Sequence, residues 1–113
     1  MQAKNPKNTT DVLRDVPGIL IRPNPRYAWE GNSQRYLVEN VRMATINPCP
    51  LLLFLSGVRI GSADEVDVDF LVSPESLEGL EVYTTVAGLP MQFNVPGAAC
   101  GVIAFWTRVG ERN

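Results

Sequence analysis

The chain has 113 residues, of which 45% are hydrophobic and 19% are charged, and its net charge at pH 7 is −2. A chain of this length forms one domain and buries enough surface to fold without metal ions or disulfides. The slight negative charge argues against nucleic acid as the main partner, because a phosphate-binding surface must be basic. The low proportion of charged residues has two interpretations. Part of the surface is covered by other copies of the chain or by a partner protein, or the chain is an ordinary β domain with few lysines.

The cellular location follows from the N-terminus and the cysteines. Residues 1–10 are polar, and no apolar segment approaches membrane-spanning length. We therefore expect folding in the cytoplasm of the producing cell and no membrane partner. Cys49 and Cys100 have no CxxC partner, and the chain has no histidine, so they form no metal site. A reducing cytoplasm favours free buried thiols, and the alternative is that the two cysteines meet across a sheet.

Three regions follow one another along the chain. Residues 1–16 are predicted to form a polar, extended N-terminal arm, residues 17–110 a single β domain, and residues 111–113 a polar tail. Thr10 is a candidate cap for one helical turn over residues 11–14, which Pro17 and Gly18 would end. The arm is either a frayed terminus or a segment that becomes ordered against a neighbouring subunit.

The β domain contains seven or eight short segments with strand character, separated by proline and glycine turns. The apolar segment 51–55 and the segment CGVIAFWTRV at 100–109 are predicted to be buried strands, the second of them central in its sheet. In residues 66–72 valine or phenylalanine alternates with Asp67, Asp69 and Leu71, which predicts a strand with one face toward the core and one toward solvent. A helical turn is predicted to begin at Pro74, with Ser73 as its cap. The other predicted strands cover residues 18–22, 34–46, 81–87 and 89–95, and the second of these segments is either one long strand or two strands joined at residues 39–40. This spacing is typical of an all-β fold, an antiparallel β-sandwich or barrel including jelly-roll variants.

The loop that follows the first strand, together with the residues just after it, combines arginines with aromatic rings. Such side chains dominate the energetics of protein interfaces and also stack on sugars or bases. Three interpretations stay open: rings that fold back over the core, a protein interface, and a glycan- or base-binding site. The candidate residues are Arg22, Arg26, Tyr27, Trp29, Arg35 and Tyr36.

The sequence contains little that points to catalysis. Without histidine, Ser-His-Asp and Cys-His arrangements are impossible, and no glycine-rich phosphate motif is present. Asp64, Asp67 and Asp69, with Glu65, are weak candidates for a calcium site, but such a row is more often the solvated face of a strand. Asp67 and Asp69 have a spacing compatible with a glycosidase pair, but nothing indicates a cleft. We therefore expect no enzyme activity, no bound metal and no cofactor.

In overall character the chain resembles the small β-structured accessory proteins of tailed-phage virions, such as those that decorate or cement a capsid. The arm over residues 1–16, the strand-rich remainder and the late strand over residues 100–109 carry the resemblance. It implies a structural protein that self-associates, often about a threefold axis, docks on a larger protein assembly and ends in the virion.

The alternative function is a small carbohydrate- or ligand-binding β-sandwich module. Tyr27, Trp29 and Tyr36 would then form a stacking platform. A minimal enzyme that uses Asp67 and Asp69 ranks last, since it requires a cleft that the sequence does not indicate.

Overall fold

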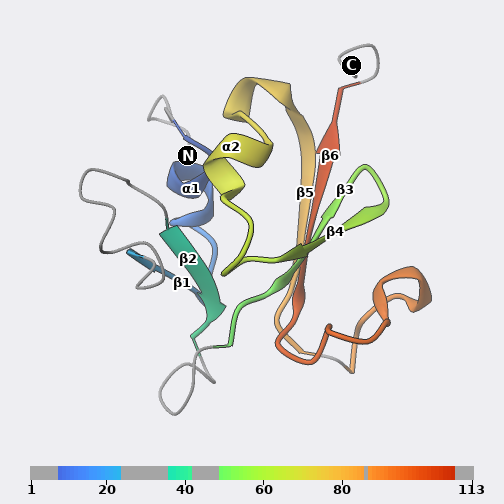
Figure 1. The fold of residues 1–113 in the computed structure, drawn as a ribbon. Helices are drawn as coiled ribbons and strands as arrows, with labels where there is room; N and C mark the ends of the chain where they lie inside the picture. The colour runs from blue at the N-terminus through green and yellow to red at the C-terminus, as the bar shows by residue number, and fades with distance from the viewer. Residues whose placement is uncertain (1–7, 24–35, 42–48, 86, 109–113) are drawn as a thin grey trace.

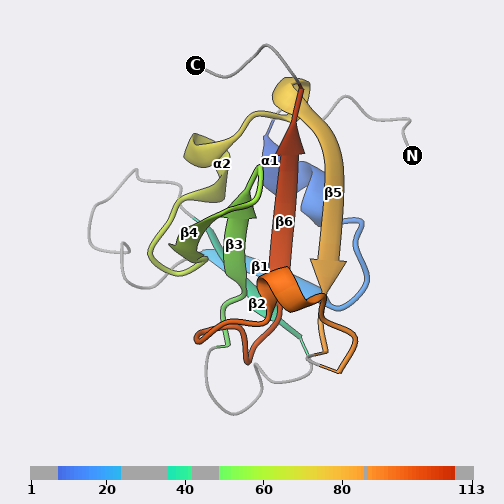
Figure 2. The same ribbon diagram turned by 90° about the vertical axis from the view of Figure 1, so that its right-hand side faces the viewer.

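The centre of the molecule is a four-stranded mixed sheet in the order β4-β3-β6-β5. The computed structural model describes residues 8–23, 36–41, 49–85 and 87–108. β3 (Leu52–Leu55) and β6 (Val102–Thr107) are parallel, whereas β4 (Val58–Ser62) runs antiparallel to β3 and β5 (Leu77–Tyr83) antiparallel to β6 (Figures 1 and 2). A second, two-stranded antiparallel sheet pairs β1 (Ile19–Pro23) with β2 (Tyr36–Asn40).

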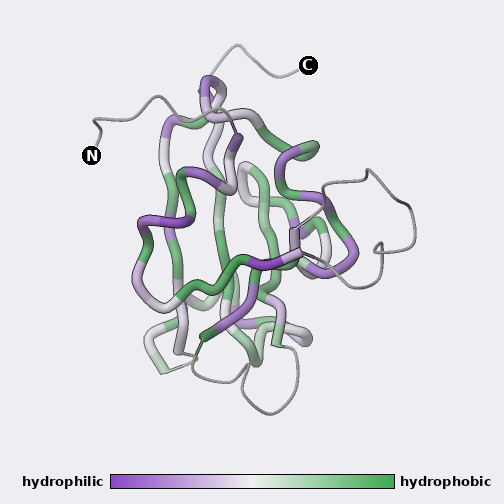
Figure 3. The backbone as a smooth tube through the Cα atoms, turned by 90° about the vertical axis from the view of Figure 1, so that its left-hand side faces the viewer, coloured by the Kyte–Doolittle hydropathy of each residue, from purple (hydrophilic) through white to green (hydrophobic). Residues whose placement is uncertain are grey.

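Each face of the large sheet carries its own hydrophobic cluster, because β3 and β6 are apolar at both parities. On one face Leu53, Ile103 and Phe105 pack with residues of α1 (Thr9–Leu13), α2 (Val68–Leu71) and the small sheet. We call this group the main hydrophobic cluster. Figure 3 views the molecule from this side, and hydrophobic and hydrophilic residues alternate along the covering segments. On the other face Leu52, Phe54, Val102 and Ala104 pack against residues of the segment 89–98. The predictions of a buried strand within residues 51–55 and a central strand within residues 100–109 are confirmed.

The fold is β-rich with short helices, which matches the predicted fold class only in part. The described strands form no closed barrel, and the large sheet is mixed rather than antiparallel. A parallel pair needs a long connection, and here β4, α2, η2 (Pro74–Ser76), β5 and η3 (Met91–Phe93) lie between β3 and β6. η2 starts at Pro74 with Ser73 as its N-cap, which confirms the helical turn predicted there.

The strand predicted over residues 66–72 is wrong, because four of its residues form α2. The side chain of Asp67 accepts a hydrogen bond from the N–H of Asp69 at 3.2 Å and thereby caps the helical turn. Val68 is buried, whereas Phe70 is 90% exposed, so the two residues do not share a face. The alternating pattern alone did not reveal that an aspartate would start a helix.

The strand predicted over residues 89–95 is also wrong. Pro90 cannot donate a backbone hydrogen bond to a strand neighbour, and it serves as the N-cap of η3. Leu89 and Phe93 are buried, but Met91 between them is 89% exposed. Phe93 anchors this segment through an edge-to-face contact with Phe54, with the ring centroids 4.7 Å apart.

The described part of the predicted arm belongs to the folded domain. α1 begins at Thr9, and Thr9, Thr10 and Leu13 are buried. The extended conformation predicted for residues 8–16 is therefore corrected, because Leu13 joins the main hydrophobic cluster and the two threonines bond to the α2 segment. Residues 1–7 and the predicted tail over residues 111–113 lie outside the described residues.

Cys49 and Cys100 form a disulfide, so the prediction of free thiols is wrong. Their Cα atoms are 5.4 Å apart. The reason is the parallel pairing of β3 and β6: Leu52 lies opposite Val102, and each cysteine precedes its strand by two or three residues. The pairing of β3 with β6 therefore brings together two cysteines that are 51 residues apart in sequence.

Candidate functional site

Two of the six predicted interface residues are described, and both contact other residues of the same chain. The Nε atom of Arg22 donates to Glu39, whose side chain is fully buried and whose other oxygen accepts the N–H of Cys49 at 3.1 Å. The Tyr36 ring lies beneath the guanidinium of Arg14, 5.3 Å from the ring centroid. Arg22 and Tyr36 thus stabilise the small sheet and its contact with α1. The other four residues lie outside the described residues: Arg26, Tyr27, Trp29 and Arg35.

The aspartates proposed as weak calcium ligands each bond within the protein. Asp64 accepts a hydrogen bond from the hydroxyl of Ser62, and Asp67 caps α2. Asp69 accepts hydrogen bonds from the N–H of Thr10 at 2.8 Å and from its hydroxyl at 3.0 Å. Among the described residues, no group of three or more acidic or cysteine side chains is gathered in a way suited to a metal ion. The aspartates predicted to line the solvated face of a strand therefore make local contacts instead: Asp64 bonds to Ser62, Asp67 caps α2, and Asp69 joins α2 to α1.

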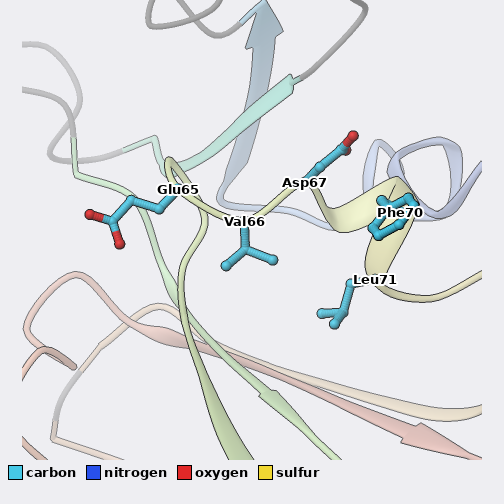
Figure 4. Close-up of a pocket in the computed structure, with 5 residues that line it drawn as sticks. All are labelled: Glu65, Val66, Asp67, Phe70 and Leu71. Atoms are coloured by element: carbon cyan, nitrogen blue, oxygen red, sulfur yellow. The ribbon is translucent and has the colours of Figure 1, made fainter.

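The surface that sequence reasoning missed surrounds Phe70. Figure 4 shows the side chains that line a pocket of about 400 Å³ there, and we call these residues the Phe70 surface: Glu65, Val66, Asp67, Phe70 and Leu71. Glu65 is exposed, and Val66 and Leu71 pack partly against the main hydrophobic cluster. The pocket therefore combines an apolar floor with acidic side chains. The Asp67 cap was the available sequence signal for this turn.

The helical turn that presents Phe70 is fixed by contacts of its other residues. Val68 belongs to the main hydrophobic cluster, Asp69 binds Thr10, and the carbonyl of Val72 accepts a hydrogen bond from the hydroxyl of Thr9. These contacts hold the backbone of the turn, while Phe70 itself is exposed. A single exposed apolar residue is common on protein surfaces, but Phe70 stands beside a pocket and on a turn that is held in place.

Met91 is the other large hydrophobic side chain that is almost fully exposed among the described residues. It lies on η3, on the side of the large sheet opposite α2 (Figure 1). Met91 does not line the pocket at the Phe70 surface. Met91 is therefore a useful comparison for Phe70, since it is similarly exposed but lies away from that pocket.

The helices in the described ranges all lack the length and apolar composition needed to cross a membrane. Comparisons of the chain with models of protein families, with curated proteins and with solved structures found no match. Function is therefore inferred from the residues of this chain and from the positions that the fold gives them.

Proposed function

We propose that this protein is a non-enzymatic interaction protein that self-associates and docks on a larger protein assembly. The observation that carries the docking proposal is the 90% exposure of Phe70 on an anchored helical turn beside a pocket. Burial of a phenylalanine side chain gains about 1.5–3 kcal/mol, so a partner that covers Phe70 gains affinity from that side chain alone. Aromatic anchors of this kind carry much of the energy of protein interfaces.

The contacts that fix α2 lower the cost of binding. Association is opposed by the ordering of side chains and loops at the interface. The hydrogen bonds of Asp69 to Thr10 and the burial of Val68 already order the backbone that presents Phe70. Docking at the Phe70 surface therefore leaves only side chains to be ordered.

The acidic residues of the Phe70 surface define the chemistry of its partner. Glu65 is exposed beside the apolar floor, and Asp67 lies at the start of α2. An apolar group flanked by lysine or arginine would match this surface, because opposite charges guide association and penalise wrong partners. We therefore propose docking on a protein surface that is basic around an apolar projection.

The assembly that we propose is a tailed-phage virion. The support is the overall resemblance of the chain to accessory capsid proteins, together with the disulfide between Cys49 and Cys100. Disulfides persist in oxidising surroundings, and virion surfaces are among them. In this proposal the chain folds in the cytoplasm of the producing cell, and the disulfide persists once the particle has left that cell.

The alternative function, a module for a carbohydrate or another small ligand, has one observation in its favour. The pocket of about 400 Å³ at the Phe70 surface has a volume within the range of small-molecule sites. The predicted platform of Tyr27, Trp29 and Tyr36 receives less support, since one side of Tyr36 is covered by Arg14. Retention of the chain on a glycan array, abolished by Phe70→Ser, would favour the ligand module at this pocket over docking.

Two measurements test the proposal. Light scattering gives the absolute mass of the full chain in solution, and we expect an oligomer. Mass spectrometry of gradient-purified particles from the phage that encodes the chain should detect the protein, with much less of it for Phe70→Ser. Met91→Ser is the matched control, because it removes an equally exposed apolar side chain from the other side of the sheet. Absence of the chain from the particles, or equal incorporation of both variants, would contradict docking through Phe70.

A further inference from the structure

The two outer strands of the large sheet have no strand partner on their outer sides in the described part of the chain. β4 and β5 stand at opposite ends of the order β4-β3-β6-β5. An unpaired edge offers a row of backbone N–H and C=O groups to another strand. The sheet thus has two different edges at which a second copy could extend it.

The directions of the strands permit a head-to-tail extension of the sheet. β4 is antiparallel to β3, β5 is antiparallel to β6, and β3 is parallel to β6, so β4 and β5 run in the same direction (Figure 2). A rotation about an axis along the strands preserves this direction. Such a rotation places β4 of one copy beside β5 of the next as a parallel pair. Repeated around an axis, this contact closes a ring if the rotation divides a full turn.

The two edges carry opposite charges. Arg59 on β4 and Glu78 and Glu81 on β5 are exposed. Arg59 donates a long hydrogen bond of 3.5 Å to the carbonyl of Pro96, and its guanidinium has further N–H donors to offer. An edge-to-edge contact between copies therefore brings a basic edge against an acidic one.

Arg59 and Glu81 also project from the same face of the sheet. Arg59 lies opposite Phe54, and Glu81 lies opposite Ala104. Phe54 and Ala104 belong to the same hydrophobic cluster, on the face covered by the segment 89–98. Because residues opposite one another in a sheet share a face, a head-to-tail pair of copies presents both charges on one side.

A twofold arrangement of two copies does not bring opposite charges together. Pairing β4 with β4 of a second copy brings two arginines to one interface, and pairing β5 with β5 gathers four glutamates. Like charges on neighbouring strands are destabilising, whereas opposite charges stabilise the pair.

We propose that copies of this chain pair head to tail, β4 of one against β5 of the next, with Arg59 facing Glu81 across the contact. This inference rests on the self-association in the proposed function and specifies its geometry. It is independent of docking through Phe70, which lies on α2 and on neither edge strand.

Charge reversal tests the contact. We expect Arg59→Glu and Glu81→Arg each to raise the dissociation constant of the oligomer by about tenfold or more, measured by light scattering and sedimentation velocity over a concentration series. The double variant restores opposite charges on the two edges and should recover assembly. Arg59→Lys and Glu81→Asp keep the charges and should assemble like the wild type. Far-UV circular dichroism checks that every variant is folded.

The outcomes separate this inference from the proposed function. A wild-type chain that is monomeric at all concentrations overturns self-association and the edge contact together. A wild-type oligomer whose mass is unchanged in both single variants overturns the edge contact and leaves self-association standing. Weakening by each single variant without recovery in the double variant overturns the pairing of Arg59 with Glu81.

Discussion

The carboxylate of Asp69 accepts two hydrogen bonds from Thr10, one from the backbone N–H at 2.8 Å and one from the hydroxyl at 3.0 Å. The two residues are 59 positions apart in the sequence. Because Thr10 lies in the first turn of α1, Asp69 satisfies an N–H group that has no partner within that helix. This contact joins α1 to α2 and holds the turn that presents Phe70.

Loss of this contact should destabilise the whole domain. Asp69→Ala removes both hydrogen bonds and leaves polar atoms of the buried Thr10 without their acceptor. We expect the free energy of unfolding to fall by about 2 kcal/mol, measured by urea denaturation. Asp15→Ala, at an exposed position after α1, serves as the control and should change stability by less than about 0.5 kcal/mol. Equal effects of the two substitutions would show that the Asp69–Thr10 contact contributes nothing.

The disulfide should contribute more to stability than any single hydrogen bond. Cys49→Ser combined with Cys100→Ser opens a loop that spans 51 residues. The chain-entropy model gives a loss of about 4 kcal/mol for a loop of this length. Denaturation with and without a reducing agent measures the effect. The reducing agent should lower the midpoint of the wild type and leave that of the double variant unchanged; identical midpoints in all four measurements would refute this expectation.

The buried carboxylate of Glu39 needs its cation. Arg22→Met leaves Glu39 with the N–H of Cys49 but without the guanidinium. We expect a loss of about 2 kcal/mol in the free energy of unfolding, less than for a fully buried pair because the Arg22 side chain is 41% exposed to solvent. Adding Glu39→Gln should recover part of the loss, since it removes the uncompensated charge. A double-mutant cycle measures the coupling, and strictly additive effects would exclude it.

Glu81 raises the pKa of Tyr83. The first cause is the hydrogen bond that the phenol donates to Glu81, at 2.9 Å, followed by desolvation and the negative charge of Glu81. Glu81→Gln should therefore lower the midpoint of tyrosinate formation, measured by absorbance, and Tyr83→Phe identifies the signal of this residue. An unchanged midpoint in Glu81→Gln would show that Glu81 is not the cause.

The same shift sets the direction of a pH effect on stability. Because the pKa of Tyr83 is higher in the folded than in the unfolded chain, the folded state holds the phenolic proton more tightly. This contribution is fully present below the unfolded value of about 10 and is lost as the pH rises through the folded pKa. We expect Glu81→Gln to reduce this alkaline pH dependence in urea denaturation curves.

The candidate site shows where prediction from the sequence reached its limit. The period-two pattern over residues 66–72 placed Val68 and Phe70 on one dry face, yet the structure buries Val68 and exposes Phe70. The pattern misled because an aspartate cap favours a helical turn, and a remote threonine holds that turn in place. Residue type selected Arg22 and Tyr36 as interface candidates, but it did not indicate the contacts that they make within the chain, with Glu39 and Arg14.

The sequence by itself determined the parts of this protein that depend on local composition. The uninterrupted apolar segments form the buried strands β3 and β6. A strand whose side chains are apolar on both faces must be covered on both faces, whatever its register. Only the tertiary structure decided which strands are neighbours, and with that the Cys49–Cys100 disulfide and the two charged edges of the sheet. Pairing between distant segments depends on how the whole chain packs, and the hydrophobic pattern of one segment carries no information about its partner.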